Sequence, residues 1–159
     1  GQGVSYDYLW NNIRVKGGAY GCMSGFSRIG DSYFTTYRDP KLRESREIFR
    51  GTPAYLAQFT ADEPTMRKYI IGTMSEVDAP LNPSARGRKA LSMYRSHVTR
   101  EDVQRERDEI LGATVEDIRA LRPIVEAVLA ADNFCVIGNE EKIQEEKDLF
   151  MEVKPLIHA

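Results

Sequence analysis

The chain has 159 residues, 42% of them hydrophobic, and a formal net charge of −2. This length and composition predict one domain, residues 1–159, built around one ordinary core. The charge argues against nucleic-acid binding, which usually needs a basic stripe, and no apolar run approaches membrane-spanning length or follows a signal-peptide pattern. Cys22 and Cys135 are too few for a disulfide framework and are expected as free thiols.

The first predicted element is the end of an amphipathic helix at Tyr6–Ile13. Leu9 and Ile13 are four residues apart, which places them on one helical face. Gly17 and Gly18 end this helix, because glycine reaches positive φ values that other residues avoid.

Two strands are predicted next, at residues 19–27 and 32–38. In the second strand alternate side chains point to one side, which is the two-residue period of a sheet. The residues on that side are Tyr33, Thr35 and Tyr37.

The rest of the chain is predicted to be mainly helical. The expected helices cover residues 41–59, 63–77, 83–96, 99–111, 114–131 and 140–153. Thr99 and Asp102 form a capping-box pattern, and Pro123 is expected to kink the helix around it. Phe134–Ile137 is wholly apolar and is expected to be a strand inside the sheet. The predicted class is α+β, an antiparallel sheet packed by helices.

The candidate functional residues flank the glycine turn. Arg14 closes the first helix and Tyr20 opens the first strand, so the turn can aim both side chains at one point. Arginine offers a rigid fork of donors and tyrosine one phenolic donor, and neither easily serves as a base near neutral pH. Such a pair can bind and polarise a peptide carbonyl, but it does not cleave a bond by itself. From the pair alone, a helix-end arginine favoured by the dipole and a core tyrosine remain the plainer interpretation.

The pair lies in the motif R-x-x-G-G-A-Y-G, which spans residues 14–21. Five further segments follow in the order YRDP, KYIIGT, DAPL, PSARG and VIGN, at residues 37–40, 68–73, 78–81, 83–87 and 136–139. Together they resemble the C-terminal half of pitrilysin/insulysin-type zinc metallopeptidases, the inverzincins, and match the presequence protease branch best. The resemblance covers nearly the whole chain.

The resemblance implies a zinc metalloendopeptidase that degrades short unfolded peptides in a closed chamber. Carried over to this sequence, Arg14 and Tyr20 would contact the substrate at the scissile bond, and Gly17 and Gly18 would position them. The alternative is a catalytically silent scaffold half that is needed only for chamber closure.

The family's zinc motif, H-x-x-E-H, is not found in this sequence. The two histidines, His97 and His158, are too far apart for one helical face. The resemblance therefore places zinc and the general base in the N-terminal half of the parent enzyme. This chain is expected to be an N-terminally truncated C-terminal module that binds no cofactor and is inactive alone.

The resemblance also implies the partners. They are peptide substrates and the N-terminal half of the same polypeptide, with no nucleic acid and no membrane. An edge exposed by truncation is expected to allow self-association. The compartment would be the cytoplasm in bacteria and an organellar matrix in eukaryotic relatives.

Other residues near these motifs have plainer readings. Gly17 and Gly18 could form a phosphate-cradling turn, but no strand precedes them and no Walker lysine–serine pattern follows. Lys16 could bind an acidic group, and Arg86 and Arg88 could line an acidic chamber wall. Solvation at the surface is the simpler interpretation of all three.

Overall fold

The computed structural model describes residues 6–28 and 30–156. In chain order the elements are η1 (Tyr6–Val15), β1 (Gly21–Phe26), β2 (Ser32–Tyr37), α2 (Leu42–Ala57), α3 (Glu63–Val77), α4 (Pro83–Arg95), α5 (Arg100–Leu111), α6 (Val115–Arg119), α7 (Arg122–Ala130), α8 (Glu140–Glu145) and η2 (Lys147–Leu149). The predicted α+β class is confirmed. None of the described helices is long and apolar enough to cross a membrane.

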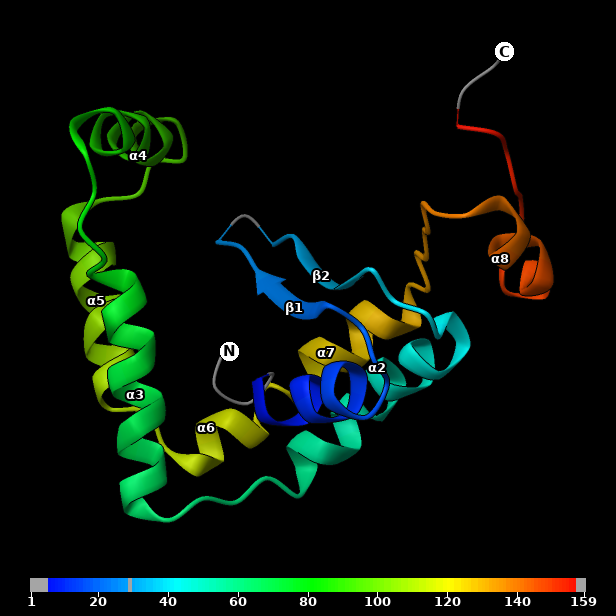
Figure 1. Ribbon diagram of the computed structural model, residues 1–159. Coiled ribbons are helices and arrows are strands. Elements are labelled where there is room, and N and C mark those ends of the chain that lie inside the picture. The colour runs from blue at the N-terminus through cyan, green and yellow to red at the C-terminus, as the bar shows by residue number, and fades with distance from the viewer. Residues whose placement is uncertain (1–5, 29, 157–159) are drawn as a thin grey trace.

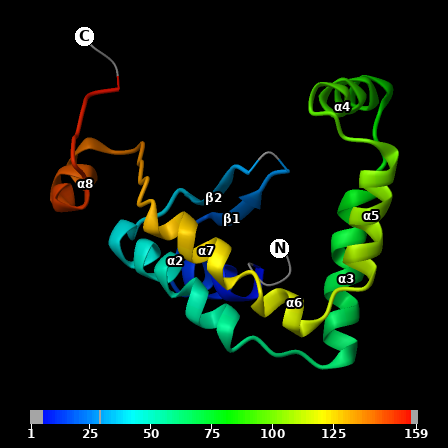
Figure 2. The ribbon, with the colours of Figure 1, turned by 180° about the vertical axis from the view of Figure 1, so that it is seen from behind.

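The elements from η1 to α7 form two parts, and α8 lies beyond them toward the C-terminus, as Figures 1 and 2 show from opposite sides. The body consists of η1, the β1–β2 hairpin, α2 and α7. The arm consists of α3, α4 and α5 and rises beside the hairpin, with α6 leading back from the arm to the body. Within the body α2 packs against η1 and α7, and within the arm α3 packs against α5.

The hairpin is an antiparallel pair whose register runs from Gly21 opposite Tyr37 to Phe26 opposite Ser32. Two small clusters of buried side chains support it. One comprises Leu9, Ile13 and Ala19. The other comprises Leu56, Phe59, Met66 and Val125. Phe34 of β2 packs against both clusters and so joins them.

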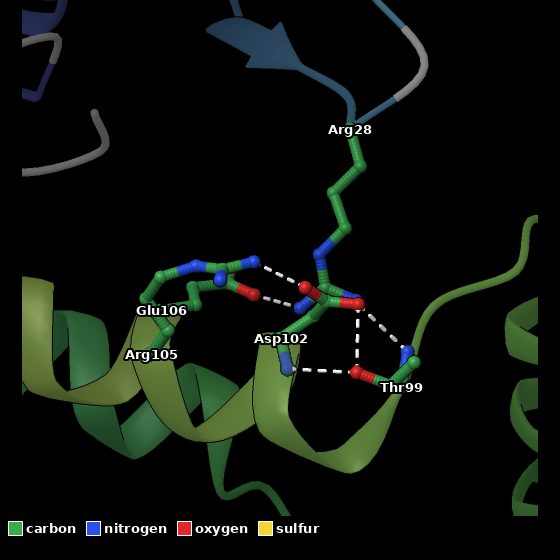
Figure 3. A network of polar contacts seen from close by, with 5 residues as sticks. All are labelled: Arg28, Thr99, Asp102, Arg105 and Glu106. Carbon is green, nitrogen blue, oxygen red and sulfur yellow. Dashed lines mark hydrogen bonds and ion pairs between the residues drawn. The ribbon is translucent and has the colours of Figure 1, made fainter.

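The arm helices begin where side chains satisfy their first backbone N–H groups. Asp62 caps α3 and Asn82 caps α4. Thr99 and Asp102 form the predicted capping box at the start of α5, as Figure 3 shows. In the same view Arg28, at the tip of the hairpin, forms an ion pair with Glu106 of α5, so the arm is tied to the body by charge.

The expected strand at Phe134–Ile137 is wrong. The residues described form one sheet, and it contains only β1 and β2. Phe134–Ile137 instead carries the chain from α7 to α8, and Ile137 is 75% exposed. Phe134 stacks on Phe150, with ring centres 5.3 Å apart. An apolar run becomes a strand only where a neighbouring edge can take its backbone hydrogen bonds, and within the described residues this segment pairs with neither β1 nor β2.

Two helix predictions also need correction. The helix expected at 114–131 is divided into α6 and α7 at Ala120–Leu121. Pro123 explains the division, because proline lacks an N–H group and its ring crowds the carbonyl four residues earlier, that of Arg119, where α6 ends. The last helix ends at Glu145 and not near residue 153. Beyond it, Asp148 pairs with Arg43 of α2, a long-range contact that the helical pattern does not contain.

The folded chain keeps a large surface. Its accessible area is 11749 Å², whereas a compact monomer of 18.1 kDa has about 8,100 Å². The accessible area is thus larger by roughly 3,600 Å², because the arm stands apart from the body and because only small clusters of side chains are buried.

Candidate functional site

The site is built on the turn between η1 and β1. The N–H of Gly18 donates to the carbonyl of Arg14 at 3.0 Å, and the N–H of Ala19 donates to that of Ile13 at 3.2 Å. Gly18 has a φ of 82°, where a side chain would be strained. At Gly17 a Cβ atom would lie 2.4 Å from the carbonyl oxygen of Ile13. Both glycines are therefore required by the geometry of the turn.

Buried side chains on either side hold this turn in place. Ile13 is fully buried and Ala19 is 3% exposed, and both belong to one cluster with Leu9. Arg14 directly follows Ile13 in the chain, and Tyr20 directly follows Ala19. Because Ile13 and Ala19 are buried together, the exposed side chains of Arg14 and Tyr20 come to the same surface.

Arg14 and Tyr20 contact each other directly. The Nε of Arg14 donates a 3.0 Å hydrogen bond to the backbone carbonyl of Tyr20. The guanidinium also stacks over the ring of Trp10. This arrangement fixes the Nε edge of the guanidinium and leaves its two terminal amino groups without a hydrogen-bond partner among the described residues. Those groups remain available as donors.

Tyr20 lies in an aromatic group with strand β2. Its ring packs edge-to-face on Tyr37 at 5.7 Å between centres, and Arg38 approaches the two rings at 5.6 and 5.4 Å. The side chain is nevertheless 65% exposed, so the alternative interpretation of Tyr20 as a core aromatic is wrong. Within the described part of the chain, the Tyr20 hydroxyl forms no hydrogen bond and can donate outward.

Two cationic side chains, Arg14 and Arg38, contact Tyr20, and the carboxylate of Asp39 lies near Cys22. Cys22 lies behind the two arginines on β1. Burial raises the pKa of its thiol, and the opposing effect of Arg14 is smaller. Because the nucleophilic form of cysteine is the thiolate, this thiol is not activated at neutral pH. The arrangement can bind and polarise an oxygen, and it supplies no base or nucleophile.

Three members of this site were missed by the sequence analysis: Trp10, Tyr37 and Arg38. Trp10 was recoverable, because it precedes Arg14 by four residues on the same helix. Tyr37 and Arg38 follow from the hairpin register, which places Gly21 opposite Tyr37 and brings the N–H of Tyr20 to the carbonyls of Tyr37 and Arg38. The backbone of Arg38 is left-handed, with a φ of 48°, and no sequence pattern indicated that.

The remaining candidates lie away from the turn or at its exposed edge. Lys16 is exposed, and Arg86 and Arg88 are exposed on α4, where Arg88 donates to Ser84 at 2.7 Å. His97 is an exposed residue after α4, and His158 lies outside the described residues. Across residues 6–28 and 30–156, no three His, Cys, Asp or Glu side chains are grouped to hold a metal ion, so this part of the chain does not fit a zinc site.

Comparison with known proteins gives a consistent result. The family described as PreP C-terminal domain matches residues 2–140. Protein HypA of Clostridium perfringens is 47% identical over 97% of this chain and 16% of its own length. Presequence protease 1, chloroplastic/mitochondrial, of Arabidopsis thaliana is 34% identical over 95% of this chain and 14% of its own length. The mitochondrial presequence protease of Eremothecium gossypii is 33% identical over 76% of this chain and 12% of its own length.

This chain thus spans about a sixth or less of the length of these relatives. The matches cover the glycine turn, the hairpin and most of the helices. The chain belongs to the PreP C-terminal domain family, within the presequence proteases of the pitrilysin type.

Proposed function

We propose that this chain is the C-terminal substrate-binding portion of a zinc metalloendopeptidase that degrades short unfolded peptides in a closed chamber. Arg14 and Tyr20 contact the peptide at the scissile bond. The observation that carries the proposal is the turn itself, which fixes Arg14 through its Nε while the other donors of both side chains stay unpaired among the described residues.

The chemistry of the pair fits an oxygen on which negative charge grows. A guanidinium and a phenol held by one turn need no reorganisation when the peptide carbonyl becomes an oxyanion. The terminal amino groups of Arg14 and the hydroxyl of Tyr20 are the donors. Neither takes a proton from water, so the general base and the zinc would belong to the N-terminal half of the same polypeptide.

A scaffold role is the second candidate, and one contact favours it. The Arg14 Nε bond to the Tyr20 carbonyl closes the turn and would support chamber closure without any substrate. The two roles differ in what Tyr20→Phe does. This substitution removes the phenolic donor but keeps the backbone carbonyl that accepts the Arg14 Nε bond. Turnover should fall if the hydroxyl contacts the substrate, whereas a scaffold should keep it.

The experiment is steady-state kinetics of the full-length parent on a fluorogenic peptide. Arg14→Ala and Tyr20→Phe should each lower kcat by roughly a hundred- to a thousandfold while KM changes little, as for removal of one oxyanion donor. Tyr94→Phe is the matched control, because Tyr94 is 80% exposed on α4. A raised KM alone would make the pair a ground-state clamp. Unchanged kinetics of Tyr20→Phe, which keeps the carbonyl that accepts the Arg14 bond, would leave the scaffold role.

The compartment in which this chain acts would be that of the full-length parent enzyme. The relatives from Arabidopsis and Eremothecium are named for chloroplasts and mitochondria. In a eukaryote the parent would act in an organellar matrix, and in a bacterium it would act in the cytoplasm.

A further inference from the structure

A cavity of about 140 Å³ lies where the body meets the arm, away from Arg14 and Tyr20. Phe34, Leu56 and Val125 line it from the body, and Met66 and Tyr69 line it from the arm. In Figures 1 and 2, α3 belongs to the arm and stands to one side of the hairpin and of α2, which belong to the body. A group bound in the cavity would therefore contact both parts of the molecule at once.

The size of the cavity matches one aromatic ring. An engineered protein cavity of about 150 Å³ with walls of leucine, isoleucine and phenylalanine stays dry and binds benzene. The walls here are mainly apolar, several of the lining side chains are aromatic, and a few of them carry hydroxyl groups. A flat six-membered ring is the group that such a space accommodates with the closest contacts.

One wall residue adds a polar requirement. Thr52 is 6% exposed, and its Oγ1 is buried without a hydrogen-bond partner among the described residues. Two other wall hydroxyls are paired: that of Tyr8 donates to the carbonyl of Ile48 at 3.1 Å, and that of Thr73 donates to the carbonyl of Tyr69 at 2.9 Å. A buried hydroxyl left unpaired destabilises the fold, and a ligand that bonds to it removes that cost.

From these observations we propose that the cavity binds a phenolic ring, the group that a tyrosyl side chain carries. The ring packs on Phe34, Leu56 and Met66, and its hydroxyl exchanges a hydrogen bond with Oγ1 of Thr52. Arg14, Tyr20 and the glycine turn do not line this cavity. The site is thus separate from the proposed contact with the scissile bond and goes beyond it.

The test uses p-cresol, which is the tyrosine side chain, and toluene, which lacks only its hydroxyl. Each is titrated into the 159-residue chain and into the full-length parent, with methyl NMR of Leu56, Met66 and Val125 to locate binding. We expect both to shift these methyl signals and p-cresol to bind about threefold to tenfold more tightly, the range of one net hydrogen bond.

Three variants make the result specific. Thr52→Val preserves the shape and should make the two affinities equal. Thr60→Val is the matched control, because Thr60 is exposed, and should keep the difference. Ala113→Met fills the cavity and should weaken both ligands. The proposal is overturned if neither ligand shifts the three methyl signals, if the wild type binds both equally, or if Thr52→Val keeps the preference while circular dichroism shows it folded.

Discussion

The guanidinium carbon of Arg14 lies 4.1 Å from the centre of the Trp10 ring, so the indole forms a flat support for the arginine fork. Combined with the Nε bond to Tyr20, this contact fixes the plane of the guanidinium on an otherwise exposed surface. A cation–π contact at an exposed site contributes about 0.5–1 kcal/mol.

Trp10→Ala should therefore lower kcat of the full-length parent by about two- to fivefold, which is that energy expressed as a rate. Trp10→Phe keeps an aromatic face and should cost less. The measurement is initial rates at saturating peptide. Equal losses in the two variants would mean that the indole supports the fold and not the guanidinium.

Gly17→Ala should destabilise the chain by about 1–3 kcal/mol, the usual cost of forcing extra atoms into a packed site. The reason is the 2.4 Å approach of the new Cβ to the carbonyl of Ile13. Gly72→Ala is the control, because nothing lies within 4 Å of its Cβ position in helix α3. It should stabilise by about 0.5–1 kcal/mol. Urea unfolding measures both, and a neutral Gly17→Ala would show that the turn relaxes freely.

Asp102 should make the stability of the chain depend on pH. Its carboxylate accepts bonds from the backbone N–H and the hydroxyl of Thr99, at 2.9 and 2.8 Å. These bonds, the backbone one first, hold the pKa of Asp102 below its usual 3.8. The pKa of Asp102 is thus lower in the folded chain than in the unfolded chain. Its carboxylate therefore stabilises the fold fully above pH 3.8, and this stabilisation is lost as the pH falls through the folded-state pKa.

The test is thermal unfolding of wild type and Asp102→Asn across this range. The wild type should be more stable at neutral pH, and its advantage should shrink as the pH falls below 3.8. Asp117 completes a capping box with Thr114 at the start of α6, and Asp117→Asn should repeat the pattern. An advantage that persists unchanged at low pH would argue against the capping carboxylate.

The isolated chain should retain no stoichiometric zinc and hydrolyse no peptide. Catalytic zinc needs three protein ligands and an open position, and no such ligand group occurs in the described residues. Metal analysis after chelation and dialysis, and a peptide cleavage assay, test the two parts. Bound zinc together with chelator-sensitive cleavage, after contaminating protease is excluded, would contradict the prediction.

Self-association through the hairpin is a further expectation. Met23, Phe26 and Tyr33 are each about half exposed on its strands, and the edges of a two-stranded sheet can pair with another chain. Light scattering over a concentration series should show oligomers, and Met23→Lys should reduce them, because edge lysines oppose strand pairing. A strict monomer at high concentration would exclude this association.

The elements that local rules determine were predictable. The α3 helix matches its prediction, and the capping box at Thr99 and Asp102 was read from spacing alone. The turn at Gly17 and Gly18 was predicted for the same reason, since positive φ, which occurs at Gly18, is a local property. The burial of Leu9 and Ile13 followed from helical periodicity.

The errors arose where distant residues decide the conformation. Phe134–Ile137 has the composition of a buried strand, yet pairing depends on an edge that no local pattern can locate. In the site, the glycine turn was enough to predict that Arg14 and Tyr20 lie together. The aromatic residues around Tyr20 depend on the register of the hairpin, which the sequence does not show. Thr52 could not be singled out, because an unpaired hydroxyl is visible only after packing.

The large surface of the folded chain also determines how it should respond to denaturant. By the usual area relations, unfolding newly exposes about 14,500 Å², where a compact protein of this mass exposes about 18,100 Å². The slope of stability against urea and the heat-capacity change on unfolding both scale with that area. Each should therefore be roughly a fifth smaller than for a compact protein of equal length, so the chain should unfold over a broad range of urea.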